Sequence, residues 1–346
     1  MKSDFVMFIM KTIRNKRERK KRTKERVRIF LIVLFCLIAI LQSGLRDINS
    51  LPLGNDTVNY QFVYEKYDKM SWSNLWGEFS FVGSDYTERD AGYPLFIKAT
   101  QVVWSNFTFF MFLTAAIFIV PFGLLIRRYV HSLLGVTLAF LIYFALFTPI
   151  VNSFMRQAVT LGISLFAIRY AIKRKWKQYY ALILVAITLH MSAIVAAPFY
   201  FLLRLKQKRE WMFRILVLLP ILVYFSTSFL SLLVGGTIYE DYLTSETENP
   251  INYAIFIVGV SLFAFLAYNN LKKRHRYDAL ICGVIGSLTL MPIIFLGNTM
   301  LRVSYYYVVL LIPLFPILID KIKMYYEMRI AAYVLTISFF LYFILR

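Results

Sequence analysis

A few polar side chains interrupt apolar stretches that are otherwise almost free of charge. They form three short groups: Arg156 and Gln157 after Asn152, His190 with Ser192, and Arg302 with Tyr305 and Tyr306. An unpaired charge among lipid chains costs on the order of several kcal/mol, so ionisable residues at that depth are usually paired or functional. A guanidinium binds phosphate oxygens through two parallel hydrogen bonds, and an imidazole exchanges a proton near neutral pH. These residues therefore suit chemistry on a phosphorylated substrate.

A second set of polar residues lies in the long polar segment that is predicted below to form an outer loop. They lie near the points where this segment meets the membrane: Arg46, Asp56, Tyr60, Arg89 and Asp90. The topology argued below brings Arg46, Arg156 and Arg302 to the same outer face, where they suit a phosphate or pyrophosphate. Each residue also has a purely structural interpretation. An arginine at a helix end can extend to the membrane interface, and Asp56 in Gly54-Asn55-Asp56-Thr57 can form an Asx turn or a helix cap.

The composition predicts an all-α polytopic membrane protein. Of 346 residues, 59% are hydrophobic and only 17% are charged, and the mean hydropathy is +0.62. Long apolar stretches recur, many close to the ~20 residues that a helix needs to cross the hydrocarbon core. Lipid offers no partner to backbone amides and no stretch alternates like a barrel strand, so the spans are expected to be helices. No cleavable signal peptide is predicted.

The net charge of +20 follows the membrane topology. Residues 11–28 hold eleven Lys/Arg and two Glu, and further basic clusters separate apolar runs. This is the positive-inside pattern of cytoplasmic loops, so we expect a cytoplasmic N-terminus and binding to membrane lipids rather than to nucleic acid. Cys36 and Cys282 lie in apolar runs and the chain has three His, so neither a disulfide framework nor a metal site is predicted, and no cofactor is expected.

The apolar runs predict about nine transmembrane helices, a re-entrant helix pair and a long outer loop, about 46–105, with interfacial helices that include Gly92–Trp104. Residues 1–28 form a basic cytoplasmic tail and residues 29–346 a single transmembrane domain. The predicted spans are Ile29–Leu45, Phe107–Ile126, Ser132–Val151, Met155–Ile172, Phe213–Val234, Ile251–Asn270, Ala279–Gly297, Val303–Ile319 and Ile330–Leu345.

The stretch Tyr179–Leu203 carries the re-entrant prediction. It is long enough for one crossing, yet basic clusters flank it on both sides. Two half-crossings on either side of Leu189–Ser192 keep both clusters cytoplasmic, and irregular backbone at depth is tolerated where protein or water surrounds it. The alternative is that Tyr179–Leu203 crosses the membrane once. The number of crossings before it would then have to differ by one, and the segment most open to reinterpretation is Gly92–Trp104. A re-entrant tip places His190 near the middle of the membrane, too deep for catalysis in the outer leaflet.

The order of these elements resembles the EpsG family, Wzy-like membrane proteins of bacterial exopolysaccharide and capsule assembly. The resemblance runs from about residue 40 to 320. The matching pieces are Arg46, Asn55-Asp56-Thr57 with Tyr60, Asp90-Ala91-Gly92-Tyr93, Asn152-x-x-x-Arg156-Gln157, Leu189-His190-Met191-Ser192-Ala193, and Arg302-x-x-x-Tyr306 ahead of Pro313. The chain departs from the family at Asp90, where Glu is usual, and at Leu189, where an aromatic residue is common.

The resemblance implies a polymerase in the bacterial cytoplasmic membrane, a metal-independent glycosyltransferase that acts at the outer face. Such an enzyme transfers glycan from undecaprenyl pyrophosphate to a sugar hydroxyl of a lipid-linked repeat unit, alongside other polysaccharide-assembly proteins. His190 or Asp56 is expected as general base, with Arg156 and Arg302 stabilising the leaving pyrophosphate. Binding is expected from Arg46, Tyr60, Asp90, Tyr93, Gln157, Ser192, Tyr305 and Tyr306. A transporter or flippase of lipid-linked sugars stays the alternative, followed by a non-catalytic assembly or lipid-binding subunit.

Overall fold

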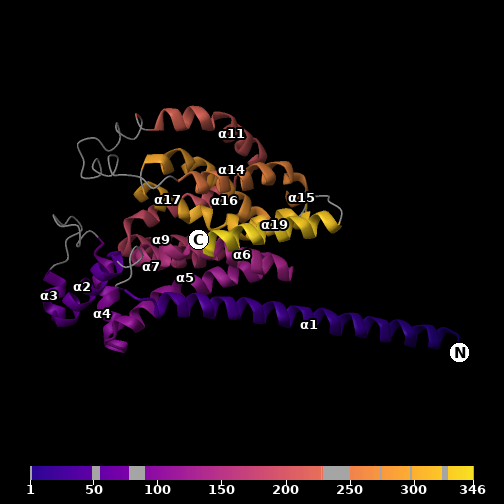
Figure 1. Ribbon diagram of the computed structural model, residues 1–346, viewed down its shortest axis with the longest axis horizontal. Coiled ribbons are helices and arrows are strands. Elements are labelled where there is room, and N and C mark those ends of the chain that lie inside the picture. The colour runs from indigo at the N-terminus through magenta and orange to yellow at the C-terminus, as the bar shows by residue number, and fades with distance from the viewer. Residues whose placement is uncertain are drawn as a thin grey trace.

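The computed structural model describes residues 2–48, 55–77, 90–226, 228, 250–272, 275–296, 298–321 and 326–345. Every regular element in these ranges is a helix, as the composition predicts. Figure 1 shows the helices running side by side, with α2, α3 and α4 gathered at one end and the N-terminus projecting beyond the other. We call the first end the site end. The other, which holds Arg28, Arg128, Arg169 and Arg276, is the basic end.

Helix α1, Lys2–Gly44, joins the basic N-terminal residues and the first apolar run in one element. Arg28 marks the change and is almost completely buried, at 5% exposed. Its guanidinium pairs with Glu25, three residues earlier on the same helix, at 2.5 Å, and donates to the carbonyls of Arg127 and Val130. These bonds fasten α1 to the end of α5, because the last carbonyls of a helix have no partner within it.

The middle of the molecule is formed by α5, Phe107–Tyr129, α6, Leu133–Leu146, and α8, Met155–Ile172. Asn106 and Ser132 begin α5 and α6 as N-caps, each accepting a backbone N–H three residues on. Glycine lets α5 and α8 approach closely: a Cβ at Gly162 would lie 2.1 Å from the carbonyl oxygen of Ile117. Pro121, four residues after Ile117, has no N–H to donate to that carbonyl, so the carbonyl is open to α8.

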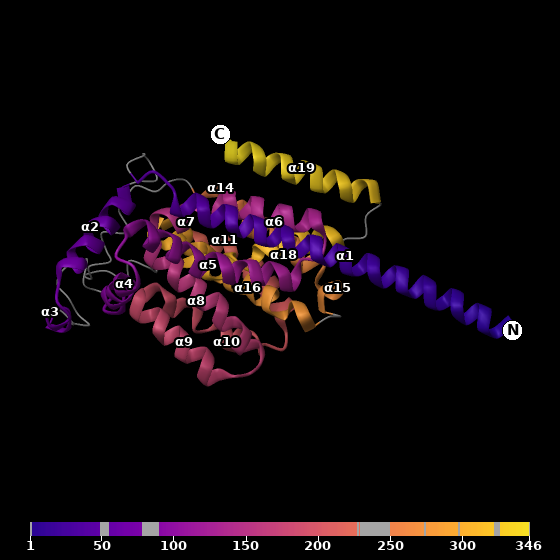
Figure 2. The ribbon, with the colours of Figure 1, turned by 90° about the horizontal axis from the view of Figure 1, so that it is seen from below.

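The second half of the chain packs around this centre. Its elements are α9, Trp176–Leu189; η1, Met191–Ala196; α10, Phe199–Leu202; α11, Lys208–Tyr224; α14, Ile251–Leu266; α15, Tyr268–Lys272; η2, His275–Tyr277; α16, Asp278–Leu290; η3, Met291–Leu296; α17, Asn298–Val308; α18, Leu311–Lys321; and α19, Tyr326–Leu345. Helix α16 and the α17–α18 pair are the most enclosed. Figure 2 shows α19 along the outer edge of the molecule.

Three short helices of the predicted outer loop form a compact unit at the site end: α2, Asn55–Lys69; α3, Trp72–Gly77; and α4, Gly92–Val103. They share a small aromatic core, in which Tyr64 and Tyr93 pack against Phe110 of α5. Lys98 of α4 donates to the carbonyl of Tyr67 at 2.9 Å. Helix α4 matches the amphipathic helix predicted at Gly92–Trp104, and these contacts fix its N-terminal end over α5.

The stretch Tyr179–Leu203 doubles back on itself. Helix α9 ends at Leu189, His190 is extended, and the chain returns as η1 and α10. The hydroxyl of Tyr179 donates to the carbonyl of Ala196 at 2.5 Å, and the rings of Tyr179 and Tyr200 lie 5.9 Å apart. With 14 residues, α9 is about 21 Å long, less than a full crossing. The stretch is therefore a hairpin, and its re-entry into a membrane stays a prediction.

Three helices in the described ranges are long and apolar enough to cross a membrane: Glu18–Gly44, Phe107–Tyr129 and Asp278–Leu296. A fourth crossing is possible as a broken span, Met300–Val308 with Leu311–Lys321, bent by 48°. Several other predicted spans are shorter or interrupted; Ser132–Val151, for example, is divided between α6 and α7, Thr148–Ser153. The nine spans stay a prediction, and the end of Phe213–Val234 lies outside the described residues.

Candidate functional site

A break between two helices places the first functional side chains. Helix α7 ends at Ser153, Phe154 leaves helical geometry, and α8 begins at Met155. The break puts Arg156 and Gln157 on the first turn of α8. A cation at a helix N-terminus opposes the helix dipole, so Arg156 needs a compensating anion.

Asp90 is that anion, and it also binds the tip of the hairpin formed by α9 and η1. One carboxylate oxygen, Oδ2, lies 3.1 Å from Nη1 of Arg156 and 2.9 Å from Nδ1 of His190. The other, Oδ1, accepts the backbone N–H of Met191 at 3.0 Å. That N–H is available because α9 ends at Leu189 and His190 is extended. A single carboxylate therefore joins the segment before α4, the start of α8 and the hairpin tip.

The surroundings of Asp90 keep it ionised. Asp90 is 5% exposed, and burial alone would raise the pKa of its carboxyl group. The hydrogen bond with His190, the charges of His190 and Arg156, and the Met191 N–H outweigh burial, so the pKa is lowered from its ordinary value. An ionised Asp90 can only accept hydrogen bonds, so each of its partners must donate one. The Nδ1 of His190 therefore carries hydrogen, and in the neutral ring Nε2 has the free lone pair.

His190 lies at the level of the site end rather than midway along the helices. It contacts Asp90, which directly precedes α4, and a Cβ at Gly92 would meet the side chain of Thr188 near the end of α9. The depth of His190 in a membrane stays a prediction. The segment that begins α4 packs on the hairpin tip through Asp90 and Gly92, a contact that the sequence pattern alone does not reveal.

The guanidinium of Arg156 lies beside two aromatic rings that also contact each other. Its Cζ is 5.8 Å from the ring centre of Tyr60 and 5.6 Å from that of Tyr93, and the two rings meet edge to face at 6.1 Å. Cation–π attraction and the Asp90 pair together fix this guanidinium. Its side chain is 27% exposed and that of His190 is 30% exposed, so both remain accessible to a ligand.

Arg46 and Arg302 approach the same α7–α8 break. The Nη2 of Arg46 donates to the carbonyl of Asn152 at 2.8 Å, an acceptor that it shares with the hydroxyl of Thr57. Burial lowers the pKa of Arg46 to about 10, which leaves it charged at neutral pH. The Cζ of Arg302 lies 3.3 Å from the ring centre of Phe154. All three predicted arginines thus lie around residues 152–156.

Helix α17 is docked onto this arrangement by two polar contacts. Gln157 donates to the carbonyl of Arg302 at 2.6 Å. The buried hydroxyl of Tyr306 lies 2.7 Å from that of Thr160 and 3.0 Å from that of Ser192, so it links α17, α8 and η1. Tyr305 points elsewhere and packs against Phe147 and Tyr253. Gln157, Ser192 and Tyr306 therefore position the arginine and the hairpin, whereas Tyr305 is removed from the site.

Asp56 takes no part in the hydrogen-bonded unit around Asp90. Asp56 lies on the first turn of α2, and no hydrogen bond or ion pair joins it to another residue in the described ranges. Its neighbour Thr57 makes the contact instead, through Asn152. Sequence reasoning missed Thr57, although it belongs to the Asn-Asp-Thr motif, and missed Phe154, which gives no polar signal. Arg89 lies outside the described residues.

The site offers a base, an orienting carboxylate and several cations in one place. An imidazole held by a carboxylate can take a proton from a hydroxyl, while guanidinium groups can stabilise a departing phosphate oxygen. In the parts of the chain that the structure describes, no three His, Cys, Asp or Glu side chains lie close enough to hold a metal ion.

Comparison with known proteins gives one match, to a family model. No curated protein and no solved structure matches the chain. The model of the EpsG family matches residues 29–346, which include every element of the site described above. Both this match and the long apolar helices indicate a membrane protein. The chain belongs to the EpsG family, whose association is with polysaccharide biosynthesis.

Proposed function

We propose that the chain is a polymerase of lipid-linked oligosaccharide repeat units. It transfers a growing glycan from undecaprenyl pyrophosphate to a sugar hydroxyl of an incoming lipid-linked unit. The observation that carries the proposal is the shared carboxylate of Asp90, whose Oδ2 lies 2.9 Å from His190 and 3.1 Å from Arg156. A proton acceptor and a cation for the leaving group are thereby held within one hydrogen-bonded unit, as this transfer requires.

His190 acts as the general base. Its Nδ1–H is held by Asp90, so Nε2 can take the proton of the acceptor hydroxyl as that oxygen bonds to the anomeric carbon of the donor sugar. The bond between the anomeric carbon and the pyrophosphate oxygen breaks, and its electron pair leaves with undecaprenyl pyrophosphate. Asp90 is a positioning residue, because it sets the tautomer of His190 and stabilises the imidazolium that forms.

Arg156, with Arg46 and Arg302 beside it, binds the pyrophosphate. The Nε–H groups of Arg46 and Arg156 are buried and find no hydrogen-bond acceptor in the described ranges. A buried donor without an acceptor costs about 1–3 kcal/mol, which a phosphate oxygen would offset. The charge that develops on the leaving oxygen is then stabilised by groups that the fold already orients.

The experiment is chromatography of lipid-linked glycans from a deletion strain that carries the wild-type chain or the variant His190→Gln. Glutamine keeps a hydrogen-bonding side chain but cannot act as a base, so single repeat units should accumulate while polymer falls about 10²–10⁴-fold. The control is Asp68→Asn, which alters an exposed carboxylate of α2 away from the site. Normal polymer from His190→Gln would remove His190 as the base.

The flippase alternative is separated by the side on which the substrate accumulates. A defective polymerase leaves single units at the outer face, where an impermeant lectin binds them on spheroplasts. A defective flippase leaves them at the inner face, where they are labelled only after lysis. Accumulation at the inner face in a strain without the chain would overturn the polymerase proposal.

A further inference from the structure

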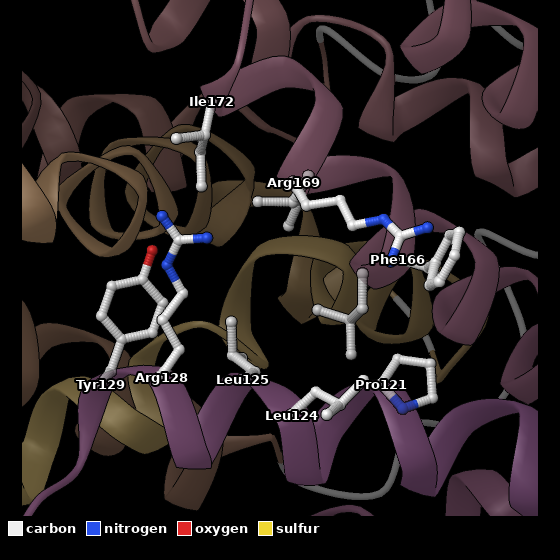
Figure 3. Close-up of a pocket in the computed structure, with 10 residues that line it drawn as sticks. Pro121, Leu124, Leu125, Arg128, Tyr129, Phe166, Arg169 and Ile172 are labelled. Carbon is white, nitrogen blue, oxygen red and sulfur yellow. The ribbon is translucent and has the colours of Figure 1, made fainter.

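A cavity of about 150 Å³ lies between α5 and α8 at the basic end, away from the candidate site. Figure 3 shows it from the side, with Pro121, Leu124 and Leu125 on α5 and Phe166 and Ile172 on α8. Leu124 is 50% exposed, so the cavity opens on the outer apolar surface of the helices. In a membrane protein that surface faces lipid chains.

The shape of the cavity follows from how the two helices meet. They touch at Gly162, which packs directly on the carbonyl of Ile117. The cavity is lined by residues further toward the basic end, from Pro121 to Tyr129 on α5 and from Leu165 to Ile172 on α8. It is therefore an apolar groove that lies beyond the glycine contact and extends toward the basic end.

Two arginines stand at the mouth of the groove, Arg128 from α5 and Arg169 from α8; in Figure 3 the side chain of Arg128 lies beside Tyr129 and that of Arg169 extends to Phe166. The guanidinium of Arg169 lies flat on the ring of Phe166, at 3.3 Å, and donates to the hydroxyl of Tyr170. That of Arg128 lies 5.5 Å from the ring of Tyr129. In the described ranges neither forms an ion pair with a carboxylate. Both retain N–H groups that suit phosphate oxygens.

We propose that this groove binds an anionic glycerophospholipid, with an acyl chain between α5 and α8 and the phosphate held by Arg128 and Arg169. The apolar lining matches an acyl chain, and the two cations at the mouth match the charge of the head group. The positive-inside pattern places this lipid in the inner leaflet. Thirteen residues of α8 separate Arg156 from Arg169, about 20 Å along the helix, so the groove is distinct from the candidate site.

The test uses the full chain, purified in detergent, and native mass spectrometry with added phosphatidylglycerol or phosphatidylcholine of the same acyl length. We expect phosphatidylglycerol to bind preferentially. The double variant Arg128→Gln with Arg169→Gln should weaken its binding by about tenfold for each arginine, the usual effect of losing a hydrogen bond to a charged group. The control, Lys175→Gln with Lys177→Gln, removes the same charge from exposed positions outside the groove and should leave binding unchanged.

A second variant tests the groove without altering its charge. Leu124→Trp fills the open side of the cavity at a half-exposed position, and it should lower phosphatidylglycerol binding. Equal losses in the lysine control, or full binding by Leu124→Trp, would reduce the effect to surface charge and overturn the proposal. Displacement of phosphatidylglycerol by an equal amount of polyprenyl phosphate would also overturn it, because the groove would then belong to the glycan carrier.

Discussion

Replacing Asp90 by Asn tests the link between structure and chemistry most directly. Asparagine keeps the size of the side chain and one carbonyl oxygen, which can still accept the N–H of Met191. Its NH₂ group, however, then faces Arg156 and His190, where Oδ2 of Asp90 accepts two hydrogen bonds. His190 can satisfy the amide only as an acceptor at Nδ1, and this moves its proton to Nε2.

The expected loss of activity is much larger than the expected loss of stability. A histidine whose Nε2 carries the proton cannot accept one from a sugar hydroxyl, so polymer synthesis should fall by about 10²–10⁴-fold. The variant also loses two charge-assisted hydrogen bonds at a carboxylate that is 5% exposed. Because water can partly solvate Arg156, at 27% exposed, we expect the free energy of unfolding to fall by about 2–3 kcal/mol.

The assay compares the ratio of polymer to single repeat units with the amount of protein in the membrane. Asp90→Asn should accumulate single units at near-normal protein level, and Asp68→Asn should behave as wild type. Near-normal polymer from Asp90→Asn would refute the Asp90–His190 mechanism. If Asp56→Asn alone abolished polymer, the base would be Asp56, and the geometry of the described site would not be that of the active enzyme.

Four further outcomes are expected. Arg156→Lys and Arg302→Lys keep the charge but lose the planar guanidinium, so each should lower polymer by about 10²–10³-fold at normal protein level; near-normal polymer from both would remove the pyrophosphate role. Tyr306→Phe removes the bonds to Thr160 and Ser192, and should lower the melting temperature of the purified protein by a few degrees, in keeping with about 1 kcal/mol per neutral hydrogen bond. The pKa of Asp90 is lowered, so its stabilising effect is present above the unfolded-state value of about 3.9 and is lost only as pH falls through the lower folded value; the difference in melting temperature between wild type and Asp90→Asn should therefore shrink as the pH is lowered below about 4. In a chain without Cys36 and Cys282, a cysteine at the exposed Lys206 should resist an impermeant maleimide on intact cells while one at Lys66 is labelled, since a hairpin returns to the side it left; labelling at Lys206 would contradict the re-entrant topology.

Local pattern in the sequence was enough for the helical class and for several helix boundaries. Apolar runs between charged clusters identify α5 and α8 closely, because burial in lipid requires long uncharged helices. The basic clusters on both sides of Tyr179–Leu203 were enough to predict a chain that turns back, and the structure has that turn at His190. Most of the candidate residues could be identified from the sequence by a related argument. A polar side chain in an apolar run is costly to bury in a membrane, so it is usually paired or functional.

The pairing of those residues was decided only by the tertiary structure. Asp90 and His190 are 100 residues apart, and no helical period or local motif relates them. Nothing in the Asn-Asp-Thr motif shows that Thr57, rather than Asp56, contacts Asn152, because that depends on how α2 is tilted by its packing on α4 and α5. The same holds for Tyr305 and Tyr306, adjacent in sequence, of which only Tyr306 faces Ser192. The sequence determines which side chains are costly to bury. The packing of distant helices determines which of these side chains form hydrogen bonds or ion pairs with one another and so offset that cost.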